Sequence, residues 1–117
     1  MRYQAEDLTI ESVERDNQLV LRWLGRSETK DPSQTLQPLM DSVINAIESV
    51  KSVEFDFRSL DYMNSSTIRP ILKLLQTASG RAANVHVRYD AGKTWQRMSF
   101  LAIGVALASL SNVKVSG

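Results

Sequence analysis

The chain has 117 residues, the length of one domain, and its 43% apolar and 23% charged residues are the balance of an ordinary globular protein. The absence of cysteine excludes disulfides and thiolate metal sites, and a formal net charge of +1 gives no electrostatic reason to expect nucleic acid or an acidic membrane as a partner. The polar start of the chain does not resemble a signal peptide, and the longest apolar stretch, 100–110, is shorter than the about 20 residues of a membrane span. We therefore expect one cytoplasmic domain over residues 1–117, without membrane insertion.

The first elements that we expect are two strands paired as a hairpin. Apolar residues alternate with polar ones over 8–13, and a second strand-like run covers 19–24. The pair Asp16-Asn17 between them is typical of a tight turn, because both residue types tolerate the backbone angles that such turns require. An antiparallel hairpin at one edge of a sheet is therefore predicted.

An amphipathic helix is expected next. After a polar loop over 26–34, apolar residues recur every three or four positions over 36–50, a spacing that places them on one face of a helix. Proline is tolerated in the first turn of a helix, where its missing N–H would have no partner. Pro38 therefore indicates that this helix begins near Thr35.

The rest of the chain alternates between strand patterns and helix patterns. Apolar and polar residues alternate in three segments, 53–57, 85–89 and 113–115. Helical spacing follows the first two of them, over 68–75 with an end at Gly80, and over 95–105. Strand–helix–strand crossovers join parallel strands, and alternation implies that one face of the sheet is covered and the other is open. The predicted fold class is therefore α/β, with a mixed sheet of about five strands and helices mainly on one face.

The most distinctive segment is 55–68. A strand there is followed by a short turn, by Met63 and by four small polar residues over 64–67, before a helix begins. Asn, Ser and Thr are preferred caps of helix N-termini, so capping alone is one explanation. A cap needs only one side-chain oxygen, however. The free N–H groups of a helix start also form an anion site, so a phosphate on Ser65 would be accommodated there.

Residues 56–67 resemble the motif of STAS domains, a family that includes the bacterial anti-sigma factor antagonists, and the order of the expected elements over 8–115 is similar as well. The resemblance implies a STAS-like domain that is not an enzyme and uses no cofactor or metal. In that family the first serine of the motif accepts a phosphate, which implies phosphorylation of Ser65, with Ser66 as the alternative. The chain departs from the family pattern at Thr67, where glycine is usual.

The resemblance also implies partners. A GHKL-type anti-sigma factor or serine kinase would add the phosphate and a PP2C-like phosphatase would remove it, so that the chain would act in a bacterial partner-switching pathway. We expect the following residues around the phosphorylation site to bind the partner: Asp31, Met63, Asn64, Ser65, Ser66 and Thr67. Met63 is expected to be an apolar anchor of this surface. Asp31 also suits a turn or a helix start before Pro32.

Other functions have weaker support in the sequence. Gly92-Lys93-Thr94 resembles the end of a phosphate-binding loop, but Val87 stands where that loop needs another glycine. His86 is the only histidine, and one histidine without cysteine cannot build a histidine-rich metal site. Its position within an expected strand also suits a catalytic serine–histidine pair poorly. The alternative that remains is a STAS-like structural subunit of a stable complex, such as a transport assembly or a signalling scaffold. In such a subunit the serines would cap the helix without being phosphorylated.

Overall fold

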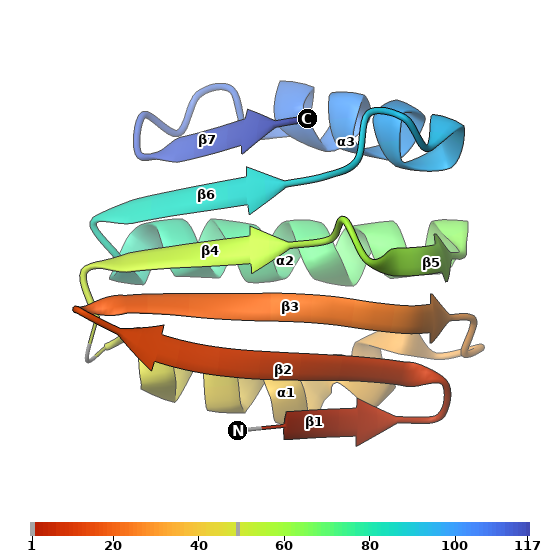
Figure 1. The fold of residues 1–117 in the computed structure, drawn as a ribbon, viewed down its shortest axis with the longest axis horizontal. Coiled ribbons are helices and arrows are strands. Elements are labelled where there is room, and N and C mark those ends of the chain that lie inside the picture. The colour runs from red at the N-terminus through yellow and green to blue at the C-terminus, as the bar shows by residue number, and fades with distance from the viewer. Residues whose placement is uncertain (1, 49) are drawn as a thin grey trace.

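A mixed sheet with three helices on one of its faces makes up the part of the chain that the computed structural model describes, residues 2–48 and 50–117 (Figure 1). The strands are β1 (Arg2–Ala5), β2 (Leu8–Arg15), β3 (Gln18–Ser27), β4 (Ser52–Asp56), β5 (Leu60–Met63), β6 (Asn84–Arg88) and β7 (Val113–Ser116). The helices are α1 (Pro32–Ile47), α2 (Ser65–Arg81) and α3 (Thr94–Ala106). The α/β fold class and the mixed sheet predicted from the sequence are confirmed.

The sheet has the strand order β1-β2-β3-β4-β6-β7, and β5 pairs with the end of β3 beyond β4. The first three strands are antiparallel, whereas β3, β4, β6 and β7 are parallel to one another. The hairpin between β2 and β3 turns at Asp16 and Asn17, whose φ angles of 52° and 64° are those that a two-residue hairpin turn requires. The predicted hairpin and the predicted crossovers are therefore correct.

The prediction of about five strands was too low, because seven are formed by the described residues. The two that were missed are β1 and β5, which have four residues each. In β1 only Tyr3 packs against the core as a large side chain, so no apolar alternation marks the strand. In β5 the buried residues are Leu60 and Met63, and two exposed residues separate them where a regular strand would have one. The alternation is broken because the pairing with β3 shifts between Gly25 and Arg26.

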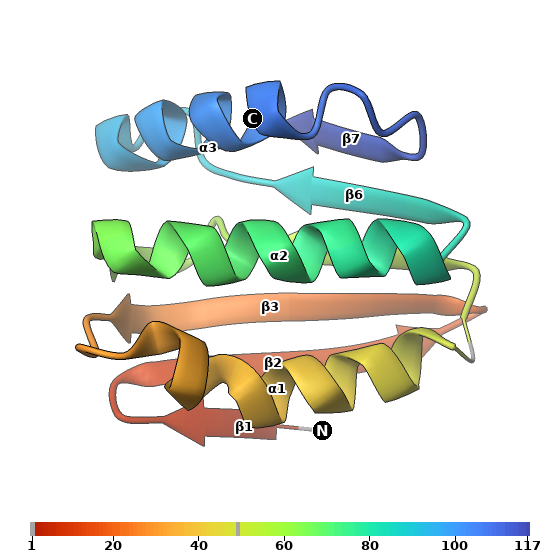
Figure 2. The same cartoon turned by 180° about the vertical axis from the view of Figure 1, so that it is seen from behind.

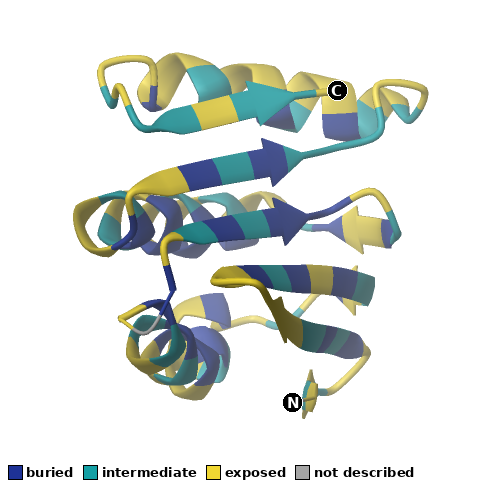
Figure 3. Cartoon of the chain, turned by 60° about the vertical axis from the view of Figure 1, so that its left-hand side comes forward, coloured by how far each residue is buried: buried dark blue, intermediate teal, exposed yellow. Residues whose placement is uncertain are grey.

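All three helices pack on the same face of the sheet, which leaves the other face open (Figure 2). The core lies between the helices and this face, and Trp23, Phe57 and Phe100 form its aromatic centre, with ring centroids 4.9 and 4.8 Å apart. Colouring by burial shows the strands as alternating buried and less buried positions (Figure 3). Within the described residues, no helix combines the length and the apolar character needed to cross a membrane.

Helix α1 begins at Pro32, so the start near Thr35 that was predicted from Pro38 is wrong. Asp31 caps it, because its Oδ1 accepts a hydrogen bond from the Gln34 N–H at 3.2 Å. Pro38 lies within the helix and cannot bond to the carbonyl four residues earlier. That carbonyl belongs to Gln34, and since both residues are exposed, water can satisfy it.

Helix α2 also passes through its predicted end at Gly80 and stops at Arg81. No αL glycine is needed there, because Asn112 from the loop before β7 caps the helix. Its side-chain amide donates to the carbonyls of Ser79 at 2.8 Å and of Ala82 at 3.1 Å. This long-range cap leaves no signal in the local sequence.

Candidate functional site

The N-terminus of α2 is fixed by Asn64. Its Oδ1 accepts hydrogen bonds from the N–H of Thr67 at 3.1 Å and from the Thr67 hydroxyl at 2.6 Å. Its Nδ2 donates to the carbonyl of Thr29 at 3.1 Å, and its backbone N–H donates to the carbonyl of Ser27 at 2.9 Å. Asn64 therefore caps α2 and also ties the helix to the loop that follows β3.

Thr67 also attaches the start of α2 to β3, through a buried hydrogen bond. It is fully buried, and its hydroxyl lies 2.9 Å from the hydroxyl of Ser27 at the end of β3. Because Thr67 donates its proton to Asn64, it accepts the proton of Ser27, and the three side chains form a continuous chain of hydrogen bonds. The threonine that replaces the usual glycine thus has a structural role, which the sequence did not indicate.

Ser65 and Ser66 differ from these neighbours because both are exposed. They occupy the first two positions of α2, where the N–H groups have no acceptor within the helix. Arg69 lies one turn after Ser65, so both occupy the same side of the helix, and Arg69 is exposed as well. The start of α2 is therefore a solvent-facing surface with two hydroxyl groups, free N–H groups and a nearby cation. We call residues 64–67 the α2 tip.

Three predicted partner-binding residues have their side chains away from this surface, and the fully buried Thr67 is one of them. Met63 is only 5% exposed and packs in the core, so it supports the α2 tip without being an apolar anchor on the outside. Asp31 is exposed, but its carboxylate is bonded within α1, at the Gln34 N–H. The loop that contains Asp31 reaches the α2 tip through the carbonyl of Thr29.

An aromatic and cationic flank adjoins the α2 tip. The guanidinium carbon of Arg26 lies 5.0 Å from the centre of the Tyr62 ring, and Tyr62 in turn lies 6.3 Å from Trp95 at the start of α3. Arg26 also forms an ion pair with Glu28, which raises the pKa of the guanidinium further above its ordinary value. The sequence predicted that the loop containing Arg26 and the turn containing Tyr62 line this surface, but it did not predict Trp95 there, because the contact between Tyr62 and α3 leaves no local pattern.

A buried glutamine positions the segment that leads to the α2 tip. The side-chain amide of Gln96, on α3, donates to the carbonyls of Phe57 at 2.7 Å and Leu60 at 2.9 Å, and its oxygen accepts from the N–H of Asp90 at 2.7 Å. Lys93 donates to the carbonyl of Leu60 as well, at 3.4 Å. Gln96 and Lys93 therefore hold the connection between β4 and β5 in place through hydrogen bonds to its carbonyls.

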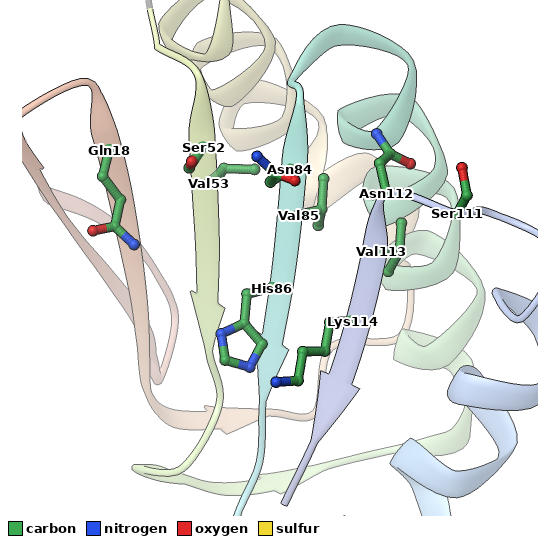
Figure 4. A pocket seen from close by; sticks show the side chains of 10 residues that line it. All are labelled: Gln18, Ser52, Val53, Asn84, Val85, His86, Ser111, Asn112, Val113 and Lys114. Carbon is green, nitrogen blue, oxygen red and sulfur yellow. The ribbon is translucent and has the colours of Figure 1, made fainter.

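The open face of the sheet carries a polar depression of about 340 Å³ around the start of β4, β6 and β7, lined by Ser52, Asn84, His86 and Lys114 among others (Figure 4). His86 shares a 2.7 Å hydrogen bond with Ser116, and its Nδ1 lies 3.7 Å from Glu54. Burial lowers the pKa of His86. The depression lies at the amino ends of the parallel strands. The α2 tip follows the carboxyl end of β5, so it lies at the opposite ends of these strands. Across residues 2–48 and 50–117, no three His, Cys, Asp or Glu side chains are grouped as a metal site would need.

Comparison with known proteins identifies the fold of the chain. Compared by sequence, the chain matches no protein-family model and no curated protein. Compared by structure, it has the STAS fold, also called the SpoIIAA-like fold, so the fold implied by the sequence resemblance is confirmed.

Three solved structures illustrate the likeness. The activator SiaC of Pseudomonas aeruginosa, solved in complex with the diguanylate cyclase SiaD, matches with a TM-score of 0.64 at 16% identity, over 99% of each chain. The anti-sigma factor antagonist SpoIIAA in its unphosphorylated form matches with a TM-score of 0.60 at 18% identity, over 94% of this chain and 88% of SpoIIAA. An anti-sigma factor antagonist from Mycobacterium paratuberculosis matches with a TM-score of 0.57 at 14% identity, over 89% of this chain and 86% of that one.

Proposed function

We propose that the chain is a non-enzymatic, cytoplasmic protein-interaction switch whose docking surface is the α2 tip and whose binding is controlled by reversible phosphorylation of Ser65. A GHKL-type partner would act as the kinase and a PP2C-like phosphatase would reverse the modification. The proposal is supported mainly by the different roles that neighbouring residues have at the start of α2. Asn64 caps the helix and Thr67 attaches it to β3, which leaves Ser65 exposed.

The charge of a phosphate explains how such a switch would work. Phosphorylation adds about −1.5 to −2 charges at neutral pH, and the free N–H groups of the helix start, together with Arg69, would stabilise that charge in the unbound protein. A partner that covers the α2 tip would remove water from the phosphate, which is unfavourable unless the partner supplies compensating charges. A penalty of roughly 3 kcal/mol would weaken binding by about a hundredfold.

The solved relatives suggest two kinds of client. Two of them are anti-sigma factor antagonists, and one of these is described in its unphosphorylated form, as expected of a protein that also exists phosphorylated. The third is the activator of a diguanylate cyclase, so a signalling enzyme is a second kind of client for this fold. The chain would release an anti-sigma factor's client in the first case and activate an enzyme directly in the second.

Mass spectrometry of the protein isolated from its native cells tests the proposal. Trypsin does not cleave before proline, so the bond after Arg69 stays intact and the whole α2 tip falls in one peptide, 59–73. Fragmentation of this peptide should place the phosphate on Ser65. The phosphate should disappear in Ser65→Ala and persist in Ser66→Ala. A peptide that is never phosphorylated in growing, starved or stressed cells would favour the structural-subunit alternative, in which the serines have no regulatory role.

A further inference from the structure

Helix α3 has apolar residues on the side that faces solvent. Met98, Leu101 and Val105 are 64%, 56% and 79% exposed, whereas Phe100 and Ile103 on the opposite side are buried in the core. A surface helix of a globular protein normally carries polar and charged residues on its outer side. The outer side of α3 is uncovered in this structure and is coloured as exposed along much of its length (Figures 2 and 3).

The spacing of these three residues is that of a helix-pairing surface. They stand at positions i, i+3 and i+7, which places them in one row along the helix, as the a and d positions of a coiled coil are placed. The row extends over about 10 Å of α3, at 1.5 Å per residue. We call Met98, Leu101 and Val105 the α3 seam. Beside it, Gly104 and the edge strand β7 form an apolar hollow of about 360 Å³ that would admit the side chains of a second helix.

The charges around the α3 seam indicate what kind of helix would pair with it. Residues 91–117 contain no aspartate or glutamate, and the cation that flanks the α3 seam is Arg97. The side chain of Lys93 donates to the carbonyls of Arg58 and Leu60, and Lys114 lies on the open face of the sheet. Arg97 directly precedes Met98, the position from which coiled-coil residues form ion pairs across a helix interface, and its side chain is exposed. A second copy of this face would offer Arg97 no acidic residue from 91–117. The complementary surface is therefore acidic.

We propose that the α3 seam docks an amphipathic helix of a partner protein whose apolar stripe is flanked by glutamate or aspartate. The surface belongs to α3 and β7, whereas the phosphorylation site belongs to α2, so this inference does not rest on the proposed function of Ser65. It gives the chain a second point of attachment, which would let one partner remain bound while binding at the α2 tip is switched on or off.

A matched pair of synthetic helical peptides tests the proposal. Both peptides carry leucine at the a and d positions of three heptads, and they differ only in having glutamate or lysine at e and g. Binding of each dye-labelled peptide to the intact chain is measured by fluorescence anisotropy. The glutamate peptide should bind, and its affinity should fall by about tenfold or more in Leu101→Gln or Val105→Gln, which remove buried apolar contacts. Arg97→Glu should reverse the preference toward the lysine peptide.

Val13→Gln is the matched control, because Val13 is a similarly exposed apolar residue, at 57%, on the open face of the sheet far from α3. Its binding of the glutamate peptide should equal that of the unmodified chain, and thermal denaturation should show that all four variants are folded. The proposal is overturned if neither peptide binds, if the glutamine variants at the α3 seam bind like the control, or if sedimentation shows a dimer of the chain that Val105→Gln dissociates.

Discussion

Replacement of Asn64 by alanine should destabilise the protein by about 2 kcal/mol, although the side chain is only partly buried. Loss of a helix N-cap costs about 1 kcal/mol, and here the cap is the bond from the Thr67 N–H to Asn64 Oδ1. The bond from Asn64 Nδ2 to the Thr29 carbonyl adds about 1 kcal/mol, because that carbonyl lies in a partly buried loop and loses its donor. Urea denaturation followed by circular dichroism measures the sum.

Two further variants separate these contributions. Asn64→Asp keeps the oxygen that caps the helix but replaces the amide donor by a second oxygen facing the Thr29 carbonyl, so it should lose at least the about 1 kcal/mol of that bond. Ser65→Ala should change the free energy of unfolding by less than about 0.5 kcal/mol, as expected for an exposed residue without a structural role. The reasoning fails if Asn64→Ala is as stable as the unmodified chain, or if Ser65→Ala is as unstable as Asn64→Ala.

Three other predictions follow from the hydrogen-bond networks. Gln96→Leu should destabilise the protein by about 2–3 kcal/mol in urea, since the carbonyls of Phe57 and Leu60 each lose a buried hydrogen bond and the Asp90 N–H loses its acceptor; a change below about 0.5 kcal/mol would show that water replaces the amide. Arg58 holds the pKa of Asp56 below its usual range, so the stability from this pair is present above about pH 4 and is lost as pH falls through the lower folded pKa. Unfolding measured between pH 2 and 6 should therefore lose this part of its pH dependence in Asp56→Asn, and an unchanged profile would exclude the pair as its source. Burial lowers the pKa of His86, so as pH falls below about 6.5 the unfolded chain is protonated before the folded one and the protein loses stability. His86→Gln should reduce this loss at low pH, which a pH series of thermal denaturation detects.

The elements that the sequence could predict are those in which apolar periodicity is long enough to read. Strands β2, β3, β4, β6 and β7 show it, and so do the three helices. Strand β5 could not be predicted, because it is defined by a shifted pairing with the end of β3 and not by its own pattern. The start of α1 was misplaced because Asp31-Pro32 is as typical of a loop as of a capped helix, and only the bond to the Gln34 N–H distinguishes the two.

The sequence could place the candidate site at the start of a helix, but the structural roles of its residues depend on contacts that are distant in sequence. The four polar residues of the α2 tip look alike locally, yet Asn64 and Thr67 turn inward because Ser27 and Thr29 provide partners there. Those partners are 35 to 40 positions earlier. Burial of Met63 likewise follows from the position of β5 within the sheet, which periodicity did not reveal. The structure shows Ser65 and Ser66 exposed, as expected of hydroxyl groups that a single cap does not use.

The affinity of the chain for the proposed GHKL-type partner, measured by isothermal titration calorimetry with Ser65 either unmodified or phosphorylated, tests the proposed switch most directly. Phosphorylation should weaken binding by about a hundredfold, or roughly 3 kcal/mol, while the amide spectrum of the free protein changes only around residues 64–69. Equal affinities for the two forms would contradict the idea that charge at the α2 tip controls docking.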